Sequence, residues 1–160
     1  MDLGLKGRSA AVAAGSRGLG RATALALARE GCLVAICGRD PKRIRASAES
    51  IERETGGRVL AVTADVSSRA DCERFIGETF GAFGRLDILV TNTGGPPAGN
   101  FATTDGAEWE KAYAGLLANV INLVRAAVPH MKEAKWGRIL NIASLSVKQP
   151  IDNLILSNTF

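Results

Sequence analysis

The residues best suited to chemistry form a short glycine-rich segment near the N-terminus, residues 13–20, which reads Ala-Ala-Gly-Ser-Arg-Gly-Leu-Gly. An apolar run of strand length, residues 9–13, precedes it, and a helical pattern of apolar residues, 19–30, follows it. A glycine-rich turn between a strand and a helix directs backbone N–H groups and the positive helix end at one point. We therefore expect this turn to bind the diphosphate of a dinucleotide.

Two common glycine patterns do not fit this turn. The spacing G-x-G-x-x-G requires a glycine at Arg17 or Leu19, and neither offset works. A P-loop would need Lys and then Ser or Thr after Gly20, but Arg21 and Ala22 follow instead. The segment therefore lacks the phosphate-binding ammonium and the magnesium-binding hydroxyl of a P-loop.

The tip of the second predicted strand, residues 32–37, indicates which dinucleotide would bind. A carboxylate there accepts hydrogen bonds from the ribose of NAD, whereas a cation suits the 2′-phosphate of NADP. The chain has Gly38 and Arg39 at this tip, and Arg17 lies in the glycine turn. Two guanidinium groups can hold a phosphate through charge-assisted bonds, so we expect NADP or NADPH. The alternative is that Arg39 only pairs with Asp40 or with the helix that follows.

An alternation of strands and helices positions these residues. Strands are predicted at residues 9–13, 32–37, 59–62, 86–90 and 138–143, and helices at 19–29, 41–55, 67–80 and 105–133. Near-continuous apolar strands are typical of parallel strands that are covered on both faces. The pattern predicts an α/β fold, a Rossmann-type doubly wound parallel sheet, as a single domain over residues 1–160.

Composition argues against several functional classes. The hydrophobic content of 46% and charged content of 22% are typical of a soluble globular protein. The net charge of +4 comes from dispersed arginines, so we expect no nucleic-acid surface. Cys32, Cys37 and Cys72 lack metal-binding spacing, and we expect reduced thiols and no metal site. No apolar run approaches the roughly 18 residues of a membrane span, so we expect a cytoplasmic protein that does not contact a membrane.

A relaxed spacing, T-G-x-x-x-G-x-G, does fit the turn. Gly18 and Gly20 are its last two glycines, while Ala13 and Ala14 replace its first two residues. We expect Gly15 to supply the missing flexibility one position late.

In this spacing the chain resembles the short-chain dehydrogenase/reductase family. Within that family it resembles most closely the 3-oxoacyl carrier-protein reductase branch, because of residues 16–20 and 38–40. The resemblance implies hydride transfer between NADP(H) and a small carbonyl or alcohol substrate. The turn residues that would hold the coenzyme are Gly15, Ser16, Arg17, Gly18, Leu19 and Gly20.

Two further segments match the family's coenzyme site. Asp65 and Val66 follow the third predicted strand and match the pair beside the adenine, although Asp65 could equally be a turn or cap residue. Residues 91–94 resemble the family's Asn-Asn-Ala-Gly after the fourth strand, which assigns Asn92 and Gly94 to the coenzyme.

The catalytic segment matches the family only in part. Ser144 matches the serine that binds the substrate oxygen, with a cap role and Ser146 as the alternatives. Ser157 falls where the family has its catalytic tyrosine, and the only tyrosine, Tyr113, lies in another helix. The family's lysine would come after Phe160. A serine without a paired base is a weaker proton donor, so a catalytically silent dinucleotide-binding module is the alternative to an enzyme.

The long helix carries the remaining expectations. The family's asparagine in this helix aligns with Leu116, and Asn119, one turn on, could substitute for it. His130 has no second ligand nearby and is expected to be structural. The resemblance covers only the first part of a family chain, with the C-terminal part of the usual fold missing. We therefore expect a fragment with incompletely covered fourth and fifth strands, or a homo-oligomer through residues 105–133.

Overall fold

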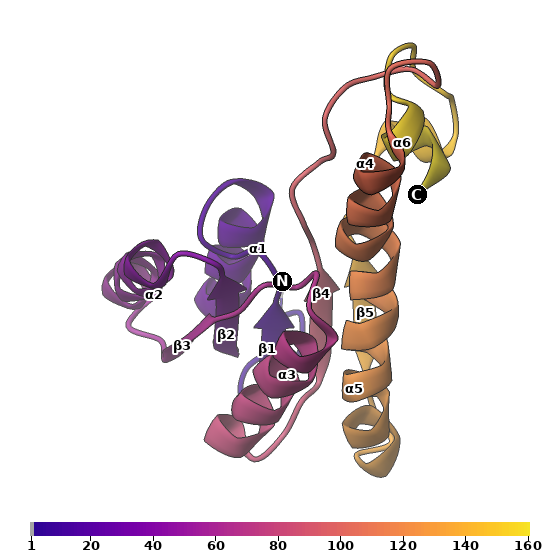
Figure 1. Cartoon of the computed structure of the whole chain (residues 1–160). Coiled ribbons are helices and arrows are strands. Elements are labelled where there is room, and N and C mark those ends of the chain that lie inside the picture. The colour runs from indigo at the N-terminus through magenta and orange to yellow at the C-terminus, as the bar shows by residue number, and fades with distance from the viewer. Residues whose placement is uncertain (1) are drawn as a thin grey trace.

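The computed structural model describes residues 2–160 and confirms the predicted fold class, with five parallel strands between two layers of helices (Figure 1). The strands are β1 Ser9–Val12, β2 Leu33–Gly38, β3 Val59–Thr63, β4 Ile88–Thr91 and β5 Arg138–Asn141. Their order across the sheet is β3-β2-β1-β4-β5. The chain runs outward from β1 to β3 and then returns to the other side of β1, so the strand order reverses beside β1. Open parallel sheets bind ligands at such a reversal, beyond the carboxyl ends of the strands.

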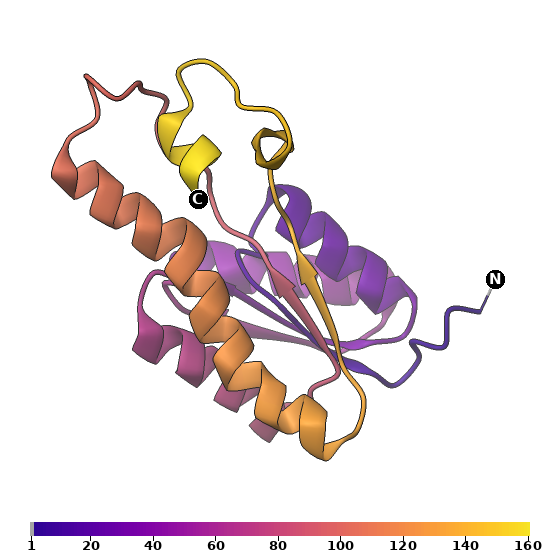
Figure 2. The same ribbon diagram turned by 90° about the vertical axis from the view of Figure 1, so that its right-hand side faces the viewer.

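The helices divide between the two faces of the sheet. They are α1 Gly18–Arg29, α2 Pro41–Thr55, α3 Arg69–Phe83, α4 Gly106–Ala112, α5 Asn119–Glu133 and α6 Ile155–Thr159, with a π-helical segment η1 Tyr113–Ala118 and a 3₁₀ turn η2 Leu145–Val147. Side chains alternate along β1, so Ala10 and Val12 pack under α1 and α2 while Ala11 packs under α3 and α5. Figure 2 shows α6 and the loop ahead of α4 lying together beyond one end of the sheet.

The covering of β4 and β5 differs from the prediction. All four residues of β4 are buried, because β1 and β5 flank it and α5 packs on it. All four residues of β5 are exposed, and Leu140 retains 51% of its accessible surface. The expectation of incomplete cover therefore holds for β5 and is wrong for β4.

The continuous helical stretch Gly106–Glu133 is, by length and composition alone, apolar enough to cross a membrane. This corrects the expectation that no run of that size exists. Length and composition do not distinguish a membrane span from a helix packed on a soluble core. Here the stretch contributes Leu123, Ala127 and Met131 to the core that it shares with α3.

A buried carboxylate fastens the amino-terminal edge of the sheet. Asp87, only 1% exposed, accepts hydrogen bonds from the backbone N–H of Ser9 at 2.8 Å, from Arg85 Nε at 2.6 Å and from Arg8 Nη1 at 3.1 Å. Burial acts to raise the pKa of Asp87, but the bonds from Arg85, Ser9 and Arg8 outweigh it and leave the pKa lowered.

Replacing this carboxylate should reduce stability in a pH-dependent way. Asp87→Asn should lower the free energy of unfolding by about 2 kcal/mol at neutral pH, less than for a fully enclosed pair because both arginines are partly exposed. The folded-state pKa is lowered, so the stabilisation is complete above the unfolded pKa of about 3.9 and is lost as the pH falls through the folded pKa.

Urea unfolding of both proteins between pH 3 and 7 measures this difference. Glu133→Gln, an exposed carboxylate without an ion pair among residues 2–160, is the matched control. A loss for Asp87→Asn that equals the control, or that stays constant down to pH 3, would contradict the role given to Asp87.

Candidate functional site

The turn between β1 and α1 has an unusual backbone at Ala14. This residue has a φ of 48°, a left-handed conformation that costs a residue with a Cβ more than it costs glycine. Gly15 does not have a positive φ. A Cβ at Gly15 would instead lie 2.7 Å from Cβ of Ile36, so glycine is needed there for close approach to β2. The expectation that Gly15 supplies the flexibility of the turn is therefore wrong, because Ala14 itself makes the bend.

The start of α1 is pressed against the end of β4. A Cβ at Gly20 would collide with the carbonyl oxygen of Ala14 and would lie 2.8 Å from Nδ2 of Asn92. The Asn92 amide donates long hydrogen bonds to the carbonyls of Ala13, at 3.4 Å, and Ala14, at 3.5 Å. Two segments that are far apart in the sequence thus meet at one point. The structure therefore brings Gly20 and Asn92 together.

The residues of this turn that lead into α1 have exposed side chains. Arg17 caps α1 with an extended backbone, and the apolar side chain of Leu19 is 66% exposed. Neither Arg17 nor Arg39 makes an ion pair with any of residues 2–160. Asp40 instead caps α2 and lies 3.8 Å from Arg43 Nη2. The alternative pairing of Arg39 with Asp40 is therefore not what the structure shows.

Ser16, Gly18 and Gly94 differ in how tightly they are packed. Ser16 lies against the tip of β2, since a Cβ at Gly38 would be 3.5 Å from its side chain. Gly18 has a φ of 57°, and nothing lies within 4 Å of a Cβ built there. A Cβ at Gly94 likewise meets nothing within 4 Å, so packing does not require glycine at that position.

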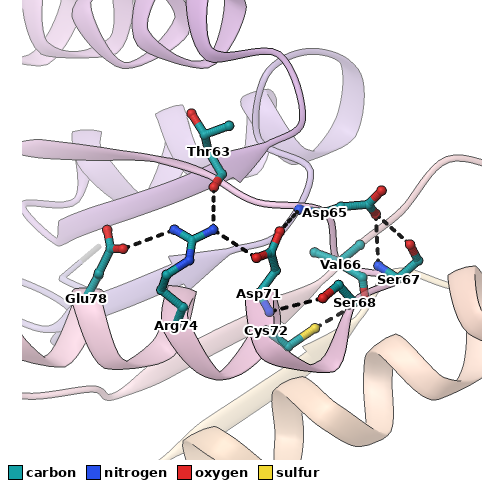
Figure 3. Close-up of polar contacts among 9 residues, drawn as sticks. All are labelled: Thr63, Asp65, Val66, Ser67, Ser68, Asp71, Cys72, Arg74 and Glu78. Carbon is teal, nitrogen blue, oxygen red and sulfur yellow. Dashed lines mark hydrogen bonds and ion pairs between the residues drawn. The ribbon is translucent and has the colours of Figure 1, made fainter.

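The loop after β3 is ordered by its own carboxylates (Figure 3). Asp65 Oδ1 accepts hydrogen bonds from the N–H and the hydroxyl of Ser67, at 3.0 and 2.8 Å. The N–H of Asp65 donates to Asp71 Oδ2 at 2.8 Å, and Arg74 Nη2 lies 3.0 Å from Asp71 Oδ1. The Asp65 N–H and then Arg74 lower the pKa of Asp71. Asp65 thus builds a turn, as the alternative proposed, while its second oxygen has no protein partner among residues 2–160.

Val66 lies in the same loop at the carboxyl edge of the sheet. Its carbonyl accepts a hydrogen bond from Cys72 Sγ at 3.2 Å, and burial raises the pKa of that thiol to about 11. The neighbouring N–H of Ala64 donates to the carbonyl of Gly38 at 3.0 Å. The loop is therefore attached directly to the tip of β2, beside Arg39.

Three serines are linked beyond β5. Ser144 caps η2 by accepting a hydrogen bond from the N–H of Ser146 at 3.1 Å, which leaves the Ser144 hydroxyl hydrogen free to donate. Ser146 Oγ lies 2.9 Å from the carbonyl oxygen of Ser157 and 3.2 Å from its Oγ. Thr91 Oγ1 donates to Asn141 Oδ1 at 2.7 Å and fastens the ends of β4 and β5 below them. The structure therefore connects Ser144 to Ser157 through Ser146, a link that the sequence did not reveal.

An aromatic cluster docks α6 on the long helix. The ring of Phe160 lies 6.0 Å from those of Trp109 and Tyr113, both in edge-to-face geometry. Tyr113 thus reaches the end of the molecule that carries α6, but it does not join the hydrogen bonds of the serines. His130 lies elsewhere, stacked on Phe80 at 4.1 Å between α5 and α3, consistent with a structural role.

Asn119 lies directly after the π-helical segment and is 1% exposed. Its Nδ2 donates to the Gly115 carbonyl at 2.6 Å, while its Oδ1 has no hydrogen-bond partner. π-helical segments are frequent at functional sites. The apolar spacing predicted one regular helix here, because side-chain periodicity does not register a change in backbone hydrogen bonding. Among residues 2–160, no cluster of three potential metal ligands occurs.

The family model for short chain dehydrogenases matches residues 8–156. The chain is 35% identical over 142 residues to a (2S)-[(R)-hydroxy(phenyl)methyl]succinyl-CoA dehydrogenase subunit of Thauera aromatica. The aligned region covers 89% of this chain and 57% of that relative. The chain is also 34% identical over 140 residues to L-fucose dehydrogenase of Rattus norvegicus, covering 87% and 50% of the two chains. The chain thus spans 57% of the length of the first relative and 50% of the length of the second.

Two solved structures share the fold closely. L-sorbose reductase from Gluconobacter frateurii, complexed with NADPH and L-sorbose, superposes with a TM-score of 0.96 at 29% identity, covering 99% of this chain and 60% of that one. A metagenomic short-chain oxidoreductase in complex with NADP superposes with a TM-score of 0.90 at 33% identity, covering 97% and 70%.

The left-handed backbone at Ala14 predicts that glycine is preferred there. Ala14→Gly should raise the free energy of unfolding by about 0.5 kcal/mol, because relief of the left-handed strain exceeds the added entropy of the unfolded chain. Ala22→Gly, an exposed site within α1, is the matched control and should lose about 1 kcal/mol. Urea unfolding midpoints measure both changes, and equal losses in the two variants would show that Ala14 is unstrained.

Proposed function

This chain belongs to the short-chain dehydrogenase family, and we propose that it functions as an NADP(H)-dependent oxidoreductase. The reaction would interconvert a carbonyl and an alcohol by hydride transfer. The observation that carries the proposal is the crowded turn at the head of α1. Glycine is required by close contact at Gly15 and Gly20, and the amides of the turn lie at the helix N-terminus where a diphosphate binds. The bound coenzyme would supply the hydride.

The residues around the turn fit the remainder of NADP(H). We assign the 2′-phosphate to Arg17 and Arg39, which are exposed and form no ion pair within residues 2–160. We assign the adenine to Asp65 and Val66, whose loop is bonded to the tip of β2. Support for the phosphate form comes from the sorbose reductase and the metagenomic enzyme, whose structures hold NADPH and NADP.

We assign substrate binding to the serines beyond β5. The free hydroxyl hydrogen of Ser144 can donate to a substrate oxygen, and we assign Ser157, which is linked to Ser144 through Ser146, to the same group. As substrate we propose a 3-oxoacyl thioester or a similar keto compound. The Thauera relative is named for a coenzyme A thioester and the rat relative for a sugar, so both kinds belong in the test.

The alternative function is a dinucleotide-binding module without catalysis. It is favoured by Ser157, a weak acid whose hydroxyl has no hydrogen-bond partner among residues 2–160 except another serine hydroxyl. Under either function we propose a cytoplasmic homo-oligomer that pairs through residues 105–133. Tyr113, Leu117 and Ile121 support this, because they are exposed at intervals of four residues along one helix face.

The coenzyme assignment predicts a specific loss of affinity. Arg39→Ala should weaken NADPH binding about tenfold and leave NADH binding unchanged, because only NADPH carries the 2′-phosphate. Calorimetric titration measures both affinities. Arg45→Ala, which removes an exposed arginine of α2, is the matched control. Equal affinities of the unmodified protein for NADH and NADPH would show that Arg17 and Arg39 do not bind the phosphate.

Catalysis is tested by NADPH consumption with a panel of 3-oxoacyl thioesters and ketoses. Ser144→Ala should lower kcat/KM about 100-fold, because the donor to the substrate oxygen is lost. Ser50→Ala on α2 should leave the rate unchanged. Tight binding of NADPH without turnover of any substrate would instead support the silent module.

A further inference from the structure

Ser146 is a buried hydroxyl group whose contacts fix the direction of a neighbouring hydrogen. Its residue is 4% exposed, and its Oγ has two acceptor atoms within reach, the carbonyl oxygen of Ser157 at 2.9 Å and Ser157 Oγ at 3.2 Å. A carbonyl oxygen can only accept, and a serine hydroxyl has one hydrogen to give. The shorter contact therefore takes the hydrogen of Ser146.

The second contact then requires Ser157 to be the donor. With this assignment the two serines make two hydrogen bonds, from Ser146 to the carbonyl and from Ser157 to Ser146. If Ser146 donated to Ser157 Oγ instead, only one bond would form and the carbonyl would lose this partner. A buried hydroxyl favours the arrangement that satisfies both contacts, since an unmade bond is costly where water is excluded.

We propose that Ser146 locks the hydroxyl hydrogen of Ser157 inward, so that Ser157 offers only lone pairs to a ligand. Ser144 differs, because its Oγ accepts from the N–H of Ser146 and its own hydrogen remains free. An alcohol can accept from Ser144 and donate to Ser157, whereas a ketone can only accept. The lock therefore favours the alcohol form of the substrate, a specificity that rests on the proposed function.

The protection that this hydrogen bond would give the Ser157 hydrogen is measurable by NMR in an equal mixture of H₂O and D₂O, and its loss in Ser146→Ala would identify Ser146 as the acceptor. A hydroxyl that exchanges slowly gives two resolved Cβ lines, one for each isotope, whereas a freely exchanging hydroxyl gives one averaged line. We expect two lines for Ser157 and for Ser146 in the unmodified protein. In Ser146→Ala the two lines of Ser157 should collapse into one.

Two further variants separate the lock from simple packing. Ser146→Thr retains the hydroxyl and should retain both lines of Ser157. Thr79→Val removes another buried hydroxyl that donates to a carbonyl, that of Phe75 on α3, and should leave Ser157 unchanged. A single line for Ser157 in the unmodified protein, or two lines in Ser146→Ala, would overturn the proposal. The first outcome needs no variant to fold.

The measurement is made without coenzyme, so it fails separately from the proposed function. Two lines for Ser157 in a protein that does not bind NADPH would keep the lock and refute the oxidoreductase. One line in a protein that binds NADPH and turns over a ketone would refute the lock and keep the enzyme.

Discussion

Backbone crowding at the head of α1 is the constraint on which the rest of the site depends. The backbone of Gly20 packs against the carbonyl of Ala14 so closely that no side chain fits between them. Asn92, from the far side of the strand reversal, reaches the same carbonyl. One contact thus fixes the bend of the turn, the entry angle of α1 and the position of the segment after β4. Because these contacts lie on the side of the turn that faces β4, the amides at the helix N-terminus remain free to bind a ligand.

The second half of the site is built on a different kind of contact. No strand carries Ser157, which lies on the short helix α6 beyond the end of the sheet (Figure 1). Phe160 holds that helix against Trp109 and Tyr113, and Ser146 holds it against the segment after β5. The proposed coenzyme site is therefore positioned by backbone close to the sheet, whereas the proposed substrate site is positioned by side chains at the margin of the sheet.

The fold was predictable because apolar runs and helical spacing are local signals, and the five strands lie within a few residues of their expected places. The role of Gly15 was misassigned, since only tertiary structure shows that Ile36 crowds it while Ala14 bends. The link from Ser146 to Ser157 was not predictable, because it depends on how a loop of irregular backbone folds back. The role of Asp65 was ambiguous for a related reason. An aspartate that orders a loop and an aspartate that binds a ligand can occur in the same local sequence, so the sequence does not distinguish them.

The most direct test of the central claim is the set of backbone amide shifts that NADPH changes in a ¹⁵N-labelled sample. If the turn receives the diphosphate, the largest changes will lie at residues 15–20, with smaller ones at Arg39 and Asn92. Largest changes near residues 132–139, where a separate hollow lies at the other end of α5, would contradict the claim, as would the absence of any change.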